Sequence, residues 1–137
     1  MRILGLDIGE KRIGVAVSDE LGLTAQGVAV IKRTSDKKDI GEILKYVEKY
    51  NVSKIVVGLP KNMNGTEGRS SELVRSFCEK LKKSLNVVIE YWDERLTTVA
   101  AEKILIQGDM SRRKRKVVID KIAAVLILQN YLDYSSR

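Results

Sequence analysis

The chain has 137 residues, with 25 Lys or Arg against 18 Asp or Glu and a formal net charge of +7. This length suits a single domain over residues 1–137, and the basic balance favours a polyanionic partner. No apolar run reaches the roughly 18 residues that a membrane helix needs, and no signal peptide is evident, so we expect a cytoplasmic protein without membrane association. With one cysteine and no histidine, a disulfide framework, a zinc finger and histidine-based catalysis are excluded.

The apolar patterns predict the element order β-β-β-α-β-α-β-α-α. The first three strands are expected at residues 2–8, 12–18 and 24–31. The later elements are expected to be a helix at 37–50, a strand at 54–59, a helix from about 66 to 84, a strand at 87–92, a helix from 97 or 98 to 106, and a helix at 117–131. This order indicates an α/β fold, in which a three-stranded antiparallel meander and two parallel strands form one mixed five-stranded sheet flanked by helices.

Several local signals refine this outline. Ser35 or Asp36 is expected to cap the first helix, and Thr66 the second. Cys78 lies in the apolar stripe of the second helix, so we expect a buried thiol that only packs. Residues 109–116 are polar and strongly basic and are predicted to form a loop.

Acidic residues stand where the expected parallel strands end. Asp7 lies near the end of an otherwise apolar strand, where a charged carboxylate needs a partner or a cation. Asp93 and Glu94 follow the last strand. Ligands of open sheets of this kind sit beyond the carboxyl ends of the parallel strands, so these acids are expected to lie close together.

Asp120 is the third acidic candidate. At helical spacing it shares a face with Ala123, Ala124 and Ile127, and the alanines would let that face pack closely on the sheet. The alternative is an acid in the first helical turn that only favours the helix dipole. Considered together with the other acids, Asp120 is better explained as part of the same site.

Carboxylates gathered without histidine predict a magnesium or manganese ion, because these metals prefer oxygen ligands. Two such ions can activate a water and stabilise the leaving oxygen of a phosphodiester. The predicted chemistry is therefore metal-dependent hydrolysis of a phosphodiester bond, without a covalent nucleophile.

Candidate contacts with nucleic acid lie near these acids. The strongest is a run of five consecutive cations just before the helix of Asp120, which we expect to contact phosphates; a merely solvated run of charge is the alternative. The run consists of Arg112, Arg113, Lys114, Arg115 and Lys116. Lys61, Asn62 and Asn64 follow the fourth strand and either contact substrate or form a tight turn. Arg95 pairs with a neighbouring carboxylate or contacts a phosphate.

Four segments of the chain resemble the YqgF (RuvX) family, in the order in which the family has them. They are Asp7-Ile8-Gly9, Gly58 to Thr66, Asp93 to Thr98, and Lys116 to Ala124. The resemblance implies a ribonuclease H-like fold related to the RuvC resolvase. Members of the family are described as Holliday-junction resolvases and as nucleases that process the 5′ end of the 16S ribosomal RNA precursor in ribosome biogenesis.

The resemblance carries catalytic roles onto Asp7, the Asp93-Glu94 pair and Asp120, with Asp7, Glu94 and Asp120 expected to hold the metal. Related resolvases have a glutamate on the strand that here ends at Leu59, where this chain has no acid. The pair at 93–94 would have to compensate. Strand alternation puts the two acids on opposite sides, and Glu94 is favoured over Asp93 because its longer side chain tolerates a displaced strand.

Three questions stay open in the sequence. The substrate is structured RNA or branched DNA, with processing of the 16S precursor favoured over junction resolution. A non-catalytic nucleic-acid-binding factor for ribosome assembly is the alternative to an enzyme. The protein is a monomer or a homodimer; symmetric cutting of a junction would require two active sites.

Overall fold

The computed structural model describes residues 1–96 and 112–135 of the chain, and within this part the side chains of residues 112–120 are not described. The helix expected from residue 97 or 98 to 106 therefore lies outside the described residues. Among the helices that are described, none combines the length and the apolar character needed to cross a membrane.

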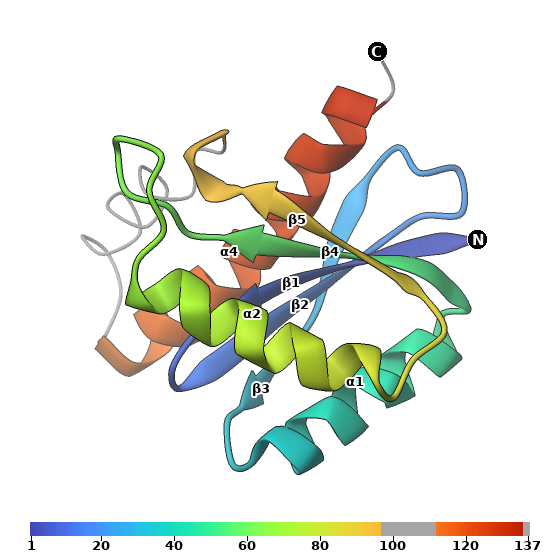
Figure 1. Cartoon of the computed structure of the whole chain (residues 1–137). Coiled ribbons are helices and arrows are strands. Elements are labelled where there is room, and N and C mark those ends of the chain that lie inside the picture. Colours follow the sequence, from blue (N-terminus) through green and yellow to red (C-terminus); the bar gives the residue numbers. More distant parts are fainter. Residues whose placement is uncertain (97–111, 136–137) are drawn as a thin grey trace.

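A five-stranded mixed sheet forms the centre of the protein (Figure 1). Its strand order is β3-β2-β1-β4-β5, with β1–β2 and β2–β3 antiparallel and β1–β4 and β4–β5 parallel. The strands are β1 (Arg2–Ile8), β2 (Arg12–Ser18), β3 (Ala25–Lys32), β4 (Val52–Leu59) and β5 (Val88–Asp93). The predicted meander and the two parallel strands are confirmed.

Helices cover both faces of this sheet (Figure 1). On one face, α1 (Asp36–Lys49) and α2 (Arg69–Lys82) pack on alternate residues of the strands, such as Leu4, Leu6 and Ile55. The other face holds α4 (Arg112–Ser135), whose buried residues pack around Ala16 and Val56. We call these the α1/α2 face and the α4 face.

The register brings the ends of three strands to one edge. Leu6 of β1 pairs with Val57 of β4, and Leu59 pairs with Asp93 of β5. Because these three strands are parallel, their last residues lie side by side (Figure 1). We call this the carboxyl edge; it includes the tight turn after β1, in which the Gly9 amide donates to the Arg12 carbonyl at 2.8 Å.

Two local predictions are wrong. Residues 112–116 are the first turns of α4 and not part of a loop, so Asp120 is not in a first helical turn. The second helix is capped by Gly68 without a side-chain bond, because the Thr66 hydroxyl donates instead to Asn64 inside the preceding turn. Helix α1 is capped as expected, since the Ser35 hydroxyl accepts from the Lys38 amide at 3.2 Å.

The prediction for Cys78 is confirmed. The side chain is fully buried in the core between α2 and the sheet. Burial raises the pKa of the thiol to about 11, because the thiolate would lose its hydration. A thiol in this state is inert, which supports a packing role.

Candidate active site

Asp7 lies on the α4 face of the sheet, at the carboxyl edge. Its neighbours Leu6 and Ile8 belong to the core under α1 and α2, so strand alternation places Asp7 opposite to them. Gly5, two residues earlier on the same face, lies directly under α4: a Cβ there would be 2.7 Å from Leu128 Cβ. Asp7 is half-buried. A carboxylate is thus held at the end of β1, where it faces the layer of α4.

Glu94 reaches the same face from a different strand. It begins the single turn of 3-10 helix Glu94–Leu96 that follows β5. Its carboxylate lies over Gly58 of β4, where an added Cβ would be 2.8 Å from Glu94 Oε1 and 2.5 Å from Ile127 Cδ1. The glycine therefore leaves the space that this carboxylate occupies, between β4 and α4.

Asp93 has a different role from its neighbour. It is the last residue of β5, and its carboxylate accepts two hydrogen bonds from Arg95 Nε and one of 2.7 Å from Nη2. The Arg95 amide also donates to Asp93 Oδ1, at 2.9 Å. Arg95 holds the pKa of the Asp93 carboxyl below its ordinary value of 3.8, mainly through the side-chain bond. The Asp93 carboxylate is therefore engaged by a cation of its own chain.

The loop after β4 is a hydrogen-bonded turn. Asn62 and Thr66 are joined by a bond between the Asn62 amide and the Thr66 carbonyl, at 2.8 Å, and by a side-chain bond of 3.0 Å. The Asn64 side chain accepts from both the amide and the hydroxyl of Thr66, and Gly65 supplies the left-handed backbone at φ 87°. Asn62 and Asn64 therefore stabilise the turn through their side-chain hydrogen bonds.

Arg95 connects this turn to the end of β5. Its Nη1 donates to the Met63 carbonyl at 3.3 Å while the rest of the guanidinium bonds Asp93. Lys61, half-buried at the start of the loop, further lowers the pKa of the Asp93 carboxyl through its charge. Of the two roles considered for Arg95, pairing with a carboxylate is the one observed.

Helix α4 brings Asp120 towards the same edge. Along the sheet, Tyr131 lies beside Lys54 near the start of β4, while Ile127 lies over Gly58 near its end. Helix α4 is therefore antiparallel to β4, and its N-terminal end lies towards the carboxyl edge (Figure 1). Asp120 precedes Ala124, which lies above Gly5, by one helical turn. Its side chain, like those of residues 112–116, lies outside the described ones.

Within the side chains that the structure describes, no three acidic, histidine or cysteine side chains form a group that could hold a metal ion. Asp7 and Glu94 both engage other groups of the protein. Two described carboxylates, those of Asp7 and Glu94, thus lie on one face of the sheet, and the backbone of α4 brings Asp120 towards them.

From the sequence, Gly58 is part of a segment that resembles the family, on a strand that lacks an acid. The structure adds that its missing side chain makes room for Glu94. A glycine inside a buried apolar strand is a recognised signal of close approach by another group, and this signal was present in the segment Val56-Val57-Gly58-Leu59.

Curated proteins match this chain over nearly its whole length. A curated protein from Carboxydothermus hydrogenoformans is 59% identical over 137 residues, covering 100% of this chain and 99% of its own length, and is named "Putative pre-16S rRNA nuclease". A protein of the same name from Clostridium tetani is 63% identical over 133 residues, which are 97% of this chain and 96% of the relative.

Solved structures show a related fold. RuvC of Thermus thermophilus superposes with a TM-score of 0.58 at 13% identity, covering 99% of this chain and 96% of RuvC. The fowlpox virus Holliday junction resolvase gives 0.55 at 18% identity, covering 98% and 99% of the two chains. The expected ribonuclease H-like fold is confirmed. Residues 1–134 match the family described as "RuvX: Holliday junction resolvase", and the chain therefore belongs to the RuvX family.

Proposed function

We propose that this protein is a metal-dependent nuclease that processes the 5′ end of the 16S ribosomal RNA precursor during ribosome biogenesis in the cytoplasm. Membership of the family makes it an enzyme of the nuclease class, a hydrolase of phosphodiester bonds. The choice of substrate follows the names of relatives that are 59% and 63% identical and align over nearly their whole length.

The residues at the carboxyl edge fit a magnesium or manganese ion. Asp7, Glu94 and Asp120 would hold it: two carboxylates face α4 from β1 and from the end of β5, and the third is on α4 itself. Magnesium uses few protein carboxylates and keeps several waters, which suits so sparse a set of ligands. When bound, the metal would supply an activated water and charge stabilisation for the leaving oxygen.

The observation that carries this proposal is the Glu94 carboxylate over Gly58. The resemblance implies an acid on this strand, where the chain has none, and the Glu94 carboxylate lies over Gly58 of this strand from the end of the neighbouring one. Asp93 cannot do the same work, because Arg95 engages its carboxylate. We therefore assign Glu94 to the metal and Asp93 to positioning, since its bonds to Arg95 tie the turn at 61–66 to the end of β5.

Cations supply the contacts with the nucleic-acid backbone in this proposal. The run Arg112 to Lys116 forms the first turns of α4, just before Asp120, and Lys61 and Arg95 lie at the end of β4 and after β5. Asn62 and Asn64 remain candidates for contacts with the nucleic acid, through the side-chain atoms that the turn does not use for hydrogen bonds. Phosphate contacts of this kind position a substrate and carry no sequence information.

The test is a paired cleavage assay of the purified protein on a 16S precursor RNA and on a four-way DNA junction, with and without Mn²⁺. We expect metal-dependent cleavage of the RNA at its 5′ side. Asp7→Asn and Glu94→Gln should lower kcat by at least about a hundredfold, since each removes a group needed for charge stabilisation. Asp93→Asn should lower it far less. Equal losses in all three variants would contradict the separate roles of Asp93 and Glu94.

Junction resolution is the second candidate function, favoured by the description of the family. Symmetric cutting of a junction needs two active sites, so it predicts a homodimer in solution, whereas RNA trimming is compatible with a monomer. Cleavage of the junction but not of the RNA, by a dimer, would replace our proposal. Salt-dependent binding without turnover on either substrate would indicate a non-catalytic assembly factor.

A further inference from the structure

Three exposed lysines of helix α1 and one of strand β3 lie around a glycine. Lys37, Lys38 and Lys45 lie on its outer side with Gly41 between them, and Lys32 ends the neighbouring strand β3. We call Lys32, Lys37, Lys38, Gly41 and Lys45 the α1 lysine surface. Its α1 members lie on the α1/α2 face, away from Asp7 and Glu94, and Lys32 lies beside them at the end of the edge strand β3. The proposed catalytic role does not use this surface.

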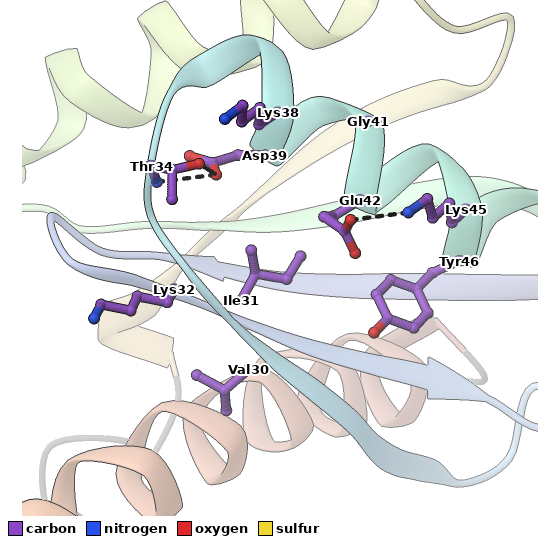
Figure 2. Close-up of a pocket in the computed structure, with 10 residues that line it drawn as sticks. All are labelled: Val30, Ile31, Lys32, Thr34, Lys38, Asp39, Gly41, Glu42, Lys45 and Tyr46. Atoms are coloured by element: carbon purple, nitrogen blue, oxygen red, sulfur yellow. Dashed lines mark hydrogen bonds and ion pairs between the residues drawn. The ribbon is translucent and has the colours of Figure 1, made fainter.

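This surface is hollowed on both sides of Gly41. Between α1 and β3 lies an open hollow of about 580 Å³, with Ile31 and Tyr46 along it (Figure 2). The lysines that line it are Lys32, Lys38 and Lys45. A second hollow, of about 590 Å³, lies between α1 and α2 and is lined by Lys37, Lys80 and Lys83 as well as Gly41. Gly41 is thus the low point between two concave regions with basic rims.

Most of the positive charge here is not neutralised within the described part of the chain. Lys45 pairs with Glu42 at 3.0 Å, but no described acid pairs with Lys32, Lys37 or Lys38. The nearby acids are used elsewhere. Asp39 is buried against Arg33, and Asp36 is bridged by Arg33 at 2.8 Å and by Lys80 at 2.6 Å. The surface therefore favours an anion with several spaced charges.

Gly41 adds an independent argument. Glycine in the middle of a helix is less stable than alanine, because it loses more backbone freedom on folding. No close contact within the described structure compensates, since a Cβ at Gly41 would meet no heavy atom within 4 Å. A glycine that costs stability and is not needed for internal packing indicates close approach by another molecule.

The surface is connected to the carboxyl edge through β3. Lys32 pairs in register with Arg12, at the start of β2. The next residue, Arg33, donates from its amide to the Lys11 carbonyl at 2.9 Å and from Nη1 to the Gly9 carbonyl at 3.1 Å. Cations at Lys11, Arg12 and Lys32 therefore lead from the turn after Asp7 towards α1.

We propose that the α1 lysine surface binds the phosphate backbone of a second segment of the nucleic-acid substrate, beyond the part that reaches the carboxyl edge. This inference rests on the proposed nuclease function. Lys37 and Lys45 are eight residues apart, roughly 12 Å along the helix axis, so the lysines form an extended row of point charges. Such a row matches phosphates along a strand or duplex, and the glycine lets the backbone lie against the helix.

Binding is measured with EDTA present, so that the result does not depend on cleavage. The double variant Lys37→Gln/Lys38→Gln is compared with Lys49→Gln/Lys82→Gln, which removes the same charge at the far ends of α1 and α2. The probes are a 16S precursor hairpin and a four-way DNA junction. We expect the first variant to weaken binding roughly tenfold or more at 0.1 M salt, and to reduce the slope of log K against log salt by roughly 1.5.

Gly41→Gln separates binding from folding. It should raise Tm by about 3 °C, because glutamine is a better helix former and meets no steric obstacle. It should nevertheless weaken binding, because the new side chain fills the low point of the surface. Equal affinities for all variants and wild type on both probes would overturn the proposal. So would equal losses in the two lysine pairs, which would indicate only a general effect of net charge. The proposed function fails separately, if the wild type does not cleave.

Discussion

Replacing Gly58 by alanine tests the central feature of the candidate site. The new Cβ would be 2.5 Å from Ile127 Cδ1 and 2.8 Å from Glu94 Oε1, whereas ordinary contacts begin at 3.4 Å. Both atoms are at the ends of flexible side chains and can move, but the carboxylate must retreat by at least about 0.6 Å. Displacements near 1 Å of a catalytic group can reduce the rate about a hundredfold.

Stability should change little in Gly58→Ala. Overpacking of this kind costs about 1 kcal/mol when the neighbours are flexible. The lower entropy of the unfolded chain offsets about 0.4–1 kcal/mol of that cost. We therefore expect kcat/KM for the RNA precursor to fall about ten- to a hundredfold, with a higher Mn²⁺ concentration for half-maximal activity and a nearly unchanged urea midpoint.

Gly27→Ala is the matched control for this substitution. Its Cβ would also press on a flexible side chain of α4, at 2.6 Å from Lys121 Cε, but from β3 and away from Glu94. It should keep the activity of the wild type. If Gly58→Ala also kept wild-type kcat/KM and Mn²⁺ dependence, the assignment of Glu94 to the metal would be refuted. Equal losses of activity in the two variants would attribute the effect to α4 packing in general.

Three further outcomes are expected. Cys78, with a pKa of about 11 and no exposure, should resist alkylation at pH 8 until the protein unfolds, and rapid native-state labelling would contradict its burial. The Asp93 carboxyl has a lowered pKa, so its contribution to stability is present above about pH 4 and is lost as the pH falls below that value. The urea midpoint should therefore drop more between pH 7 and pH 3 in the wild type than in Asp93→Asn. The difference should be small, because the pair with Arg95 is near the surface. Arg113, seven residues before Asp120, lies on the same face of α4 as Asp120, and Arg115 does not. Arg113→Gln should therefore weaken RNA binding more than Arg115→Gln. Equal effects of the two substitutions would contradict this placement.

The topology was predictable because the apolar patterns are simple. The strands at 2–8 and 12–18 have the predicted bounds, and the parallel strand predicted at 54–59 from its apolar residues is β4, which begins two residues earlier, at Val52. The start of α4 was not predicted, because the five consecutive cations were interpreted as part of a polar, basic loop. Helix propensity was the better guide there, since lysine and arginine are good helix formers.

The sequence placed Asp7 and the Asp93-Glu94 pair at one edge of the sheet, and the structure has them there. Strand alternation put Asp93 and Glu94 on opposite sides, and in the structure one is bonded to Arg95 while the other lies over Gly58. The sequence offered two roles for Arg95, and the single 3-10 turn that follows β5 brings its side chain back onto Asp93. For Asn62 and Asn64 it offered a tight turn or a contact with substrate, and local hydrogen bonds place both in the turn.

The position of Glu94 also explains why an acid and a glycine have to be considered together. A carboxylate on β4 itself would need a side chain at position 58, and the space for that side chain is filled by Glu94 and Ile127. Glu94, the residue after β5, lies over Gly58 because β4 and β5 are neighbouring strands, roughly 4.8 Å apart. The short 3-10 turn then directs Glu94 back over β4. Glycine at 58 and glutamate at 94 are thus coupled parts of one arrangement, in which a change at either position removes the reason for the other.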